Sequence, residues 1–183
     1  MARFSMRRSG SVVLAVLLLG LARLAQASDA DLITEAQRTM ALYQKADPGI
    51  AAFMRSSAGY AVFPKVTKGA VGIGGAHGTG VLFERGRPIG KATLTQVTVG
   101  AQLGGQEYSQ VVFLQTPAVL ADFKTGKTSF AAQASAVALR SGAAATAKYQ
   151  NGVAIFTATT GGLMAEASVG GQKFSFEPFA PQP

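Results

Sequence analysis

Residues 58–83 read AGYAVFPKVTKGAVGIGGAHGTGVLF, and their composition indicates the class of fold. Glycine is mixed here with Val, Ala, Thr and Phe, and Pro64 interrupts the first apolar run. Short β-type runs that are bounded by Gly and Pro are typical of antiparallel strands. The pattern predicts a sheet whose glycines permit bulges, tight curvature and close approach of neighbouring backbones.

The same mixture of glycine with β-forming residues continues along most of the chain that follows. Residues 85–88 (Arg-Gly-Arg-Pro) are predicted to form a hairpin tip that presents two guanidinium groups to solvent. Strands are predicted at 60–63, 70–73, 81–83, 93–99, 111–114, 153–157 and 163–169.

Two helices are predicted before the sheet. Residues 28–45 carry apolar side chains at helical spacing, with acidic side chains near the N-terminal end, where the helix dipole favours them. Asp47 as a cap and Pro48 in the first turn are then predicted to begin a short second helix over 50–54. Both helices are expected to pack onto the core, because neither is apolar enough to insert into a membrane alone.

One further helix is predicted within the sheet region. Thr116 and Pro117 open it, it runs through Phe123, and Gly126 closes it. Residues 130–139 are rich in Ala, so propensity favours a helix there, although the pattern alone does not decide between helix and strand.

Residues 1–27 have the parts of a cleavable secretory signal peptide. An arginine-containing start precedes an apolar run over 12–22, and an Ala-x-Ala pattern ends at Ala27. The apolar run is too short to span a bilayer comfortably, which takes about 20 residues. The mature protein is therefore predicted to be exported, to the periplasm or beyond. Residues 28–176 are predicted to form a single domain, and residues 177–183, with three prolines, an extended tail.

The positive charge of the chain is concentrated in two places. The net charge is +8, but four of the 17 basic residues lie in residues 1–27, and the remainder has 13 basic and 9 acidic residues. Between residues 55 and 91 there are six basic residues and one acid, Glu84. Such a cluster fits an anionic ligand or surface, or a solvated face without a partner. The candidate lipid headgroup ligands are Lys65, Lys68, Arg85, Arg87 and Lys91.

Sequence motifs for catalysis or cofactor binding are not recognised. The glycines of residues 69–80 lack the G-x-G-x-x-G spacing, and a strand-like run follows them instead of a helix. Residues 126–128 (Gly-Lys-Thr) resemble the end of a phosphate-binding loop, but such a loop needs a glycine five residues before Gly126, where Ala121 stands. The single histidine, His77, is predicted to lie in a loop, with no carboxylate near in sequence and no nucleophile elbow. No catalytic residue, metal ligand or cofactor is therefore predicted.

The amino-acid composition excludes further classes of function. The chain has no Cys, which excludes thiol catalysis, Cys-based metal sites and acylation at the cleavage site. It has no Trp and no charged aromatic platform of the kind that binds nucleic acid, so no nucleic-acid partner is expected.

Several motifs follow one another in a fixed order between residues 29 and 176. They are AGYAVFPK (58–65) with Lys68-Gly69, GIGG (72–75), GTGVL (78–82), VGAQLGGQ (99–106), and GLMA (162–165) with Ser168 and Gly171. Together they resemble the SYLF domain, a lipid-binding family whose eukaryotic members include actin-binding proteins. Tyr43 and Asp47-Pro48 resemble its bacterial, exported form.

The resemblance implies an α+β fold: N-terminal helices followed by a curved, mainly antiparallel, Gly-rich β-sheet or barrel with one further short helix. It also implies that residues 130–139 form a strand, against their helix propensity. The implied function is non-enzymatic binding of lipid, and for an exported protein the expected lipid is an anionic phospholipid or membrane surface.

Two other functions stay open. The chain could be a structural or protein-interaction module of the cell envelope, whose sheet packs on a partner protein. An enzyme acting on an envelope polymer would need an acid–base pair, which no sequence motif supplies.

Overall fold

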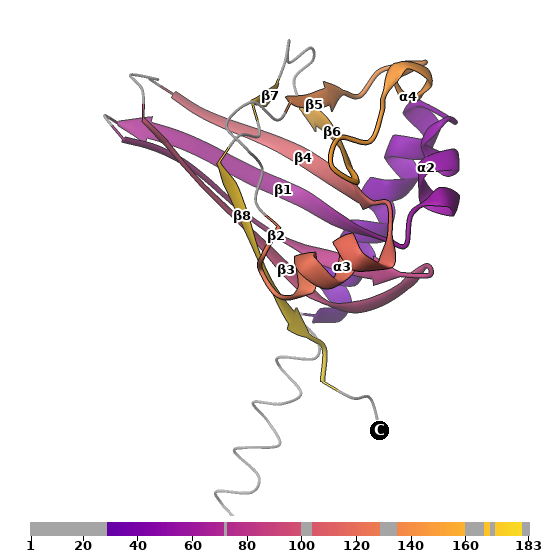
Figure 1. Ribbon diagram of the computed structural model, residues 1–183. Coiled ribbons are helices and arrows are strands. Elements are labelled where there is room, and N and C mark those ends of the chain that lie inside the picture. The colour runs from indigo at the N-terminus through magenta and orange to yellow at the C-terminus, as the bar shows by residue number, and fades with distance from the viewer. Residues whose placement is uncertain are drawn as a thin grey trace, which may run out of the picture.

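The computed structural model describes residues 29–71, 73–99, 104–128, 135–159, 167–168 and 171–180. The predicted signal peptide lies outside these residues. Within them the fold is α+β, as expected, with a curved and mainly antiparallel sheet (Figure 1). No helix in the described part of the chain is both long and apolar enough to cross a bilayer.

The described strands form one eight-stranded sheet in the order β7-β5-β6-β4-β1-β2-β3-β8. Neighbouring strands are antiparallel, except that β5 runs parallel to β6. The strands are β1 (Gly59–Val71), β2 (Ile73–Glu84), β3 (Arg87–Val99), β4 (Gly104–Leu114), β5 (Ser135–Ala138), β6 (Val153–Thr159), β7 (Ala167–Ser168) and β8 (Gln172–Pro178).

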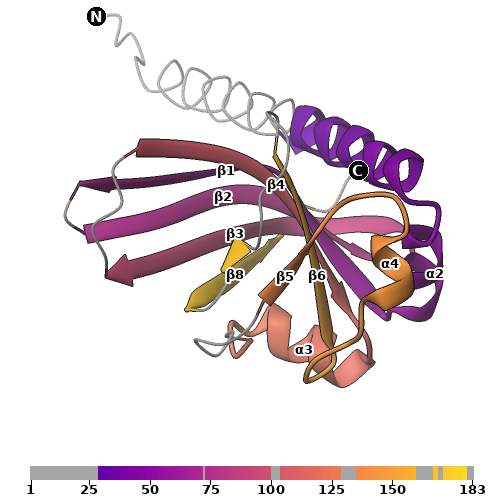
Figure 2. The same ribbon diagram turned by 90° about the horizontal axis from the view of Figure 1, so that it is seen from above.

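Helices cover both faces of this sheet. A helix over residues 29–46 and α2 (Ile50–Ser56) lie on one face, and α3 (Pro117–Lys124) lies on the other (Figure 2). A fourth helix, α4 (Ala143–Thr146), adds a single turn, so two short helices follow the first strands where one was expected. The ends of α3 follow its sequence signals: the Thr116 side chain accepts a hydrogen bond from the backbone N–H of Val119, and Gly126 has φ +70° just beyond the helix.

A β-bulge in β1 accounts for the proline in a central strand. Val62 pairs with Val81, but Lys65 pairs with Thr79, so β1 contains one extra residue around Pro64. Proline has no N–H to give to the ladder and is tolerated at bulges. The extra residue also reverses the alternation of side chains, which brings Phe63 and Val66 into the same core.

The sheet is curled, so its faces form two separate cores. The concave core contains Phe63, Val66, Leu94, Phe123 and Phe174. The helix-side core packs residues of the first two helices against the opposite face of the strands. Its members include Met40, Tyr43, Ile50, Val62, Phe83, Val111, Phe113 and Phe156.

A reciprocal amide pair spans the concave core. Gln110 on β4 and Gln172 on β8 are fully buried, and each side-chain amide donates to the other's oxygen, at 2.9 and 3.2 Å. Three strands separate β4 from β8 in the sheet order. The side chains can therefore meet only because the sheet curls around this face.

Gln110→Leu is expected to lower the free energy of unfolding by about 1–3 kcal/mol, because it leaves the buried Gln172 amide without its partner. The double variant Gln110→Leu/Gln172→Leu removes both polar groups, so it should lose less than the sum of the two single variants. Urea unfolding of the four proteins measures this coupling. Strictly additive losses would show that the pair contributes no interaction energy.

Residues 135–138 are strand β5, so the strand that the resemblance implied is confirmed there, against the helix propensity; residues 130–134 lie outside the described chain. Other predictions made from the sequence are wrong in detail. His77 lies in β2 and not in a loop. Helix α2 begins at Ile50 with Gly49 as its N-cap, so Asp47 is not the cap. Strand β8 extends to Pro178, so the predicted tail is paired at its start.

Candidate functional site

The β2–β3 hairpin ends in a tight turn formed by Arg85 and Gly86. Both residues have positive φ, 52° and 76°, the combination that two-residue hairpin turns of type I′ require. Glycine adopts this conformation freely, whereas a non-glycine residue pays about 1–2 kcal/mol for it, least for Asn or Asp. An arginine at this position is costly for folding, and such outliers tend to mark functional positions.

The hairpin tip carries two exposed cations. Arg85 and Arg87 are both exposed, and neither guanidinium lies within ion-pair distance of a carboxylate of a described residue. The neighbouring acid, Glu84, accepts from Lys124 on α3, with Nζ and Oε2 2.8 Å apart. The tip therefore presents an excess of positive charge to solvent.

The other three predicted headgroup ligands lie elsewhere. Lys65 is paired with Glu107 on β4 at 2.7 Å, and Lys91 with Asp29 at 3.3 Å, both on the helix side of the sheet. Lys68 pairs across the strands with Ala76, a member of the concave core, so it belongs to the opposite face. The structure thus brings together Arg85 and Arg87, and the five residues do not form one patch.

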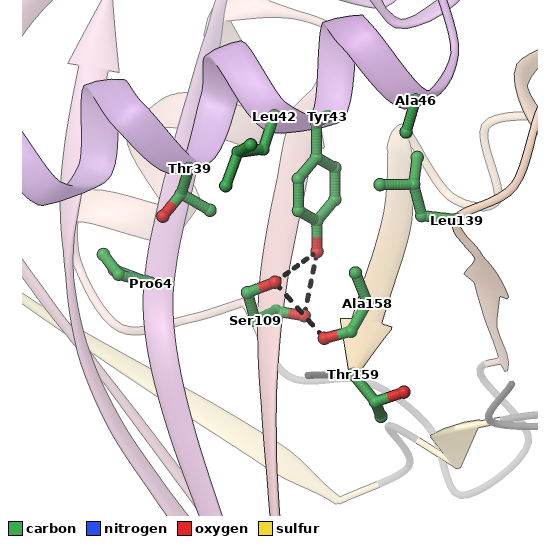
Figure 3. Close-up of a pocket in the computed structure, with 9 residues that line it drawn as sticks. All are labelled: Thr39, Leu42, Tyr43, Ala46, Pro64, Ser109, Leu139, Ala158 and Thr159. Atoms are coloured by element: carbon green, nitrogen blue, oxygen red, sulfur yellow. Dashed lines mark hydrogen bonds between the residues drawn. The ribbon is translucent and has the colours of Figure 1, made fainter. Parts of the chain in front are cut away.

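A pocket of about 340 Å³ lies between the N-terminal helix and the sheet, and no motif in the sequence indicated it (Figure 3). Its residues come from five separate segments of the chain, so their spacing carries no signal. The one local hint is Leu42, which lies off the buried stripe of the helix and is 65% exposed. The lining residues are Thr39, Leu42, Tyr43, Ala46, Pro64, Ser109, Leu139, Ala158 and Thr159.

Hydrogen bonds close the base of this pocket. The Tyr43 hydroxyl donates to the backbone oxygen of Ser109 at 2.9 Å and lies 3.1 Å from its Oγ. Ser109 Oγ in turn donates to the carbonyl of Ala158 at 3.3 Å (Figure 3). Burial raises the pKa of Tyr43 well above its usual value, and its hydrogen-bonding contact with Ser109 only partly offsets this. Tyr43 is therefore a neutral donor at physiological pH.

The arrangement of the described residues offers surfaces for binding. Over the described ranges, no three His, Cys, Asp or Glu side chains lie together as metal ligands. His77 is exposed on β2, and no carboxylate of the described residues forms an ion pair with it.

Comparison with known families agrees with the resemblance drawn from the motifs. Residues 95–178, a little under half of the chain, match the Ysc84 family, which is described as "Las17-binding protein actin regulator". The match runs from within β3 to the end of β8, and this part of the chain is similar to the Ysc84 (SYLF) family, a family of lipid-binding and actin-regulating domains. No curated protein matches the chain.

Proposed function

We propose that this protein is exported and binds the surface of an anionic phospholipid membrane in the cell envelope, without enzymatic activity. The observation that carries the proposal is the hairpin tip, where Arg85 and Arg87 are exposed and unpaired among the described residues. The similarity of residues 95–178 to a lipid-binding family supports a membrane partner. The export step rests on the signal-peptide pattern of residues 1–27.

The expected attachment is weak and sensitive to salt. A basic residue near an anionic leaflet contributes about 1 kcal/mol, and this falls off within a Debye length of about 8 Å at physiological ionic strength. Two arginines therefore provide about 2 kcal/mol, which is about a 30-fold change in affinity. Apolar contacts must supply the rest of the binding free energy.

The double variant Arg85→Asn/Arg87→Gln tests the hairpin directly. Asparagine is favoured at the first position of a type I′ turn, so the variant removes two charges without disturbing the hairpin. Its affinity for vesicles of phosphatidylglycerol and phosphatidylcholine should fall about 30-fold in a sedimentation assay.

The matched control is Arg140→Gln/Lys148→Gln, which removes one exposed cation on each side of α4. Neither residue has a carboxylate partner in the described part of the chain. The control should bind vesicles like the unmodified protein. Equal losses in the two double variants would show that net charge, and not the hairpin, governs attachment.

A protein partner in the envelope is the second candidate function, because the matching family is named for binding another protein. Here the curled sheet would serve as an interaction module without lipid specificity. Capture of one envelope protein by the immobilised domain, together with absence of vesicle binding, would favour this function over the first.

A further inference from the structure

The pocket beneath the N-terminal helix has the chemistry of an aliphatic binding site. Leu42, Ala46, Pro64 and Leu139 form much of its wall (Figure 3). Its volume of about 340 Å³ lies at the small end of the range for ligand pockets, which is about 300–1,000 Å³.

The polar groups at its base are already used within the protein. The Tyr43 hydroxyl donates to a Ser109 backbone oxygen, and Ser109 Oγ donates to the Ala158 carbonyl. A polar ligand group reaching this depth would lose its hydration and find these groups occupied, which is unfavourable. An apolar chain has no hydrogen bonds to water to lose there, and it buries its own apolar surface.

A pair of opposite charges stands next to the pocket on the same face of the sheet. Lys65 directly follows the lining residue Pro64, and Glu107 lies two residues before the lining residue Ser109 on β4. Side chains two residues apart on a strand share a face. The Lys65–Glu107 ion pair has both side chains more than half exposed, so a charged group beside the pocket can reach either partner.

We propose that this pocket holds one aliphatic chain of a single lipid molecule, whose polar head group stays outside beside Lys65 and Glu107. This site is separate from the hairpin tip and takes a lipid monomer, whereas the tip would meet a membrane surface. The two proposals can therefore fail independently.

The test is a titration of the purified protein with cis-parinaric acid, a fluorescent fatty acid, kept below its aggregation concentration and without vesicles. We expect a saturable fluorescence increase with one probe per chain. In Ala46→Phe the new ring occupies the pocket, and excluding even two methylenes weakens chain binding about tenfold.

The matched control is Ala41→Phe, an exposed alanine on the same helix that does not line the pocket. It should bind the probe like the unmodified protein. Leu42→Asp is a second pocket variant, because it puts a charge at the wall through an exposed side chain and leaves the core intact. It too should weaken binding, whereas Arg85→Asn/Arg87→Gln should not.

Failure of the unmodified protein to bind the probe would overturn the proposal. So would unchanged affinity in both pocket variants, or the same loss in Ala41→Phe. None of these results depends on whether the protein binds vesicles, so each leaves the proposed function of the hairpin to its own experiment.

Discussion

Asp47→Ala is expected to lower the free energy of unfolding by about 3 kcal/mol or more. The Asp47 carboxylate is 3% exposed. Its Oδ1 accepts from the backbone N–H of Gly49 at 2.9 Å, and its Oδ2 from that of Ala144 at 2.7 Å. The side chain thus joins the start of α2 to α4, far apart in sequence. Alanine would leave both N–H groups without this acceptor, at about 1–3 kcal/mol each.

Thermal unfolding measures this loss, and a drop in Tm of about 6–12 °C is expected for a chain of this length. The Tm of Asp47→Asn should lie between the Tm of the unmodified protein and that of Asp47→Ala. The reason is that an amide has one oxygen and would turn its NH₂ group toward the second backbone N–H. Asp122→Ala is the control, since Asp122 is an exposed carboxylate on α3. If Asp47→Ala and Asp122→Ala have the same Tm, the Asp47 carboxylate does not hold α4 to the start of α2.

Gly80→Ala should destabilise the protein by a similar amount, because β1 leaves no room for a Cβ at this position of β2. A Cβ placed on Gly80 would overlap the Val62 carbonyl oxygen and lie 2.8 Å from a ring carbon of Phe63. Backbone atoms cannot move aside as a flexible side chain can. Overpacking of this kind costs about 1–3 kcal/mol and sometimes more.

Gly69→Ala on β1 gives the matched control. A Cβ there meets nothing within 4 Å, and no positive φ favours glycine at that position. Alanine should be neutral or slightly stabilising, since glycine costs about 0.5–1 kcal/mol relative to alanine inside a strand. Equal urea midpoints for the two variants would contradict the close approach of β1 to β2 at Gly80.

The parts of the fold that depend on local chemistry could be predicted from the sequence. The glycines predicted a sheet with bulges and close approaches, and the structure has a bulge in β1 and a close contact at Gly80. The bulge lets β1 continue through Pro64, whereas the first strand was predicted to end at residue 63. The hairpin tip followed from its turn residues, and α3 from its Thr and Gly boundaries.

Features set by distant pairing could not be predicted in this way. The Ala-rich segment before Leu139 favours a helix by propensity, but β5 pairs with β6 and β7 and becomes a strand. Asp47 looks like a helix cap in sequence, while its second acceptor is used by Ala144 almost a hundred residues away.

The candidate site also combines local features, which could be predicted, with features set by distant parts of the chain, which could not. Arg85 and Arg87 are neighbours in one turn, so their proximity is local. Lys65 and Lys68 are close in sequence but three residues apart on one strand, which places them on opposite faces. The pocket around Tyr43 and Ser109 exists only because a helix crosses strands from separate parts of the chain.

Binding of the mature protein to phospholipid vesicles tests the central proposal most directly. Sedimentation would compare vesicles with and without phosphatidylglycerol, at ionic strengths of about 0.1 M and 1 M, where the Debye length is about 10 Å and 3 Å. We predict binding to the anionic vesicles at low salt, and its loss at high salt or without the anionic lipid. Binding that is equal for both kinds of vesicle and insensitive to salt would contradict an electrostatic membrane contact.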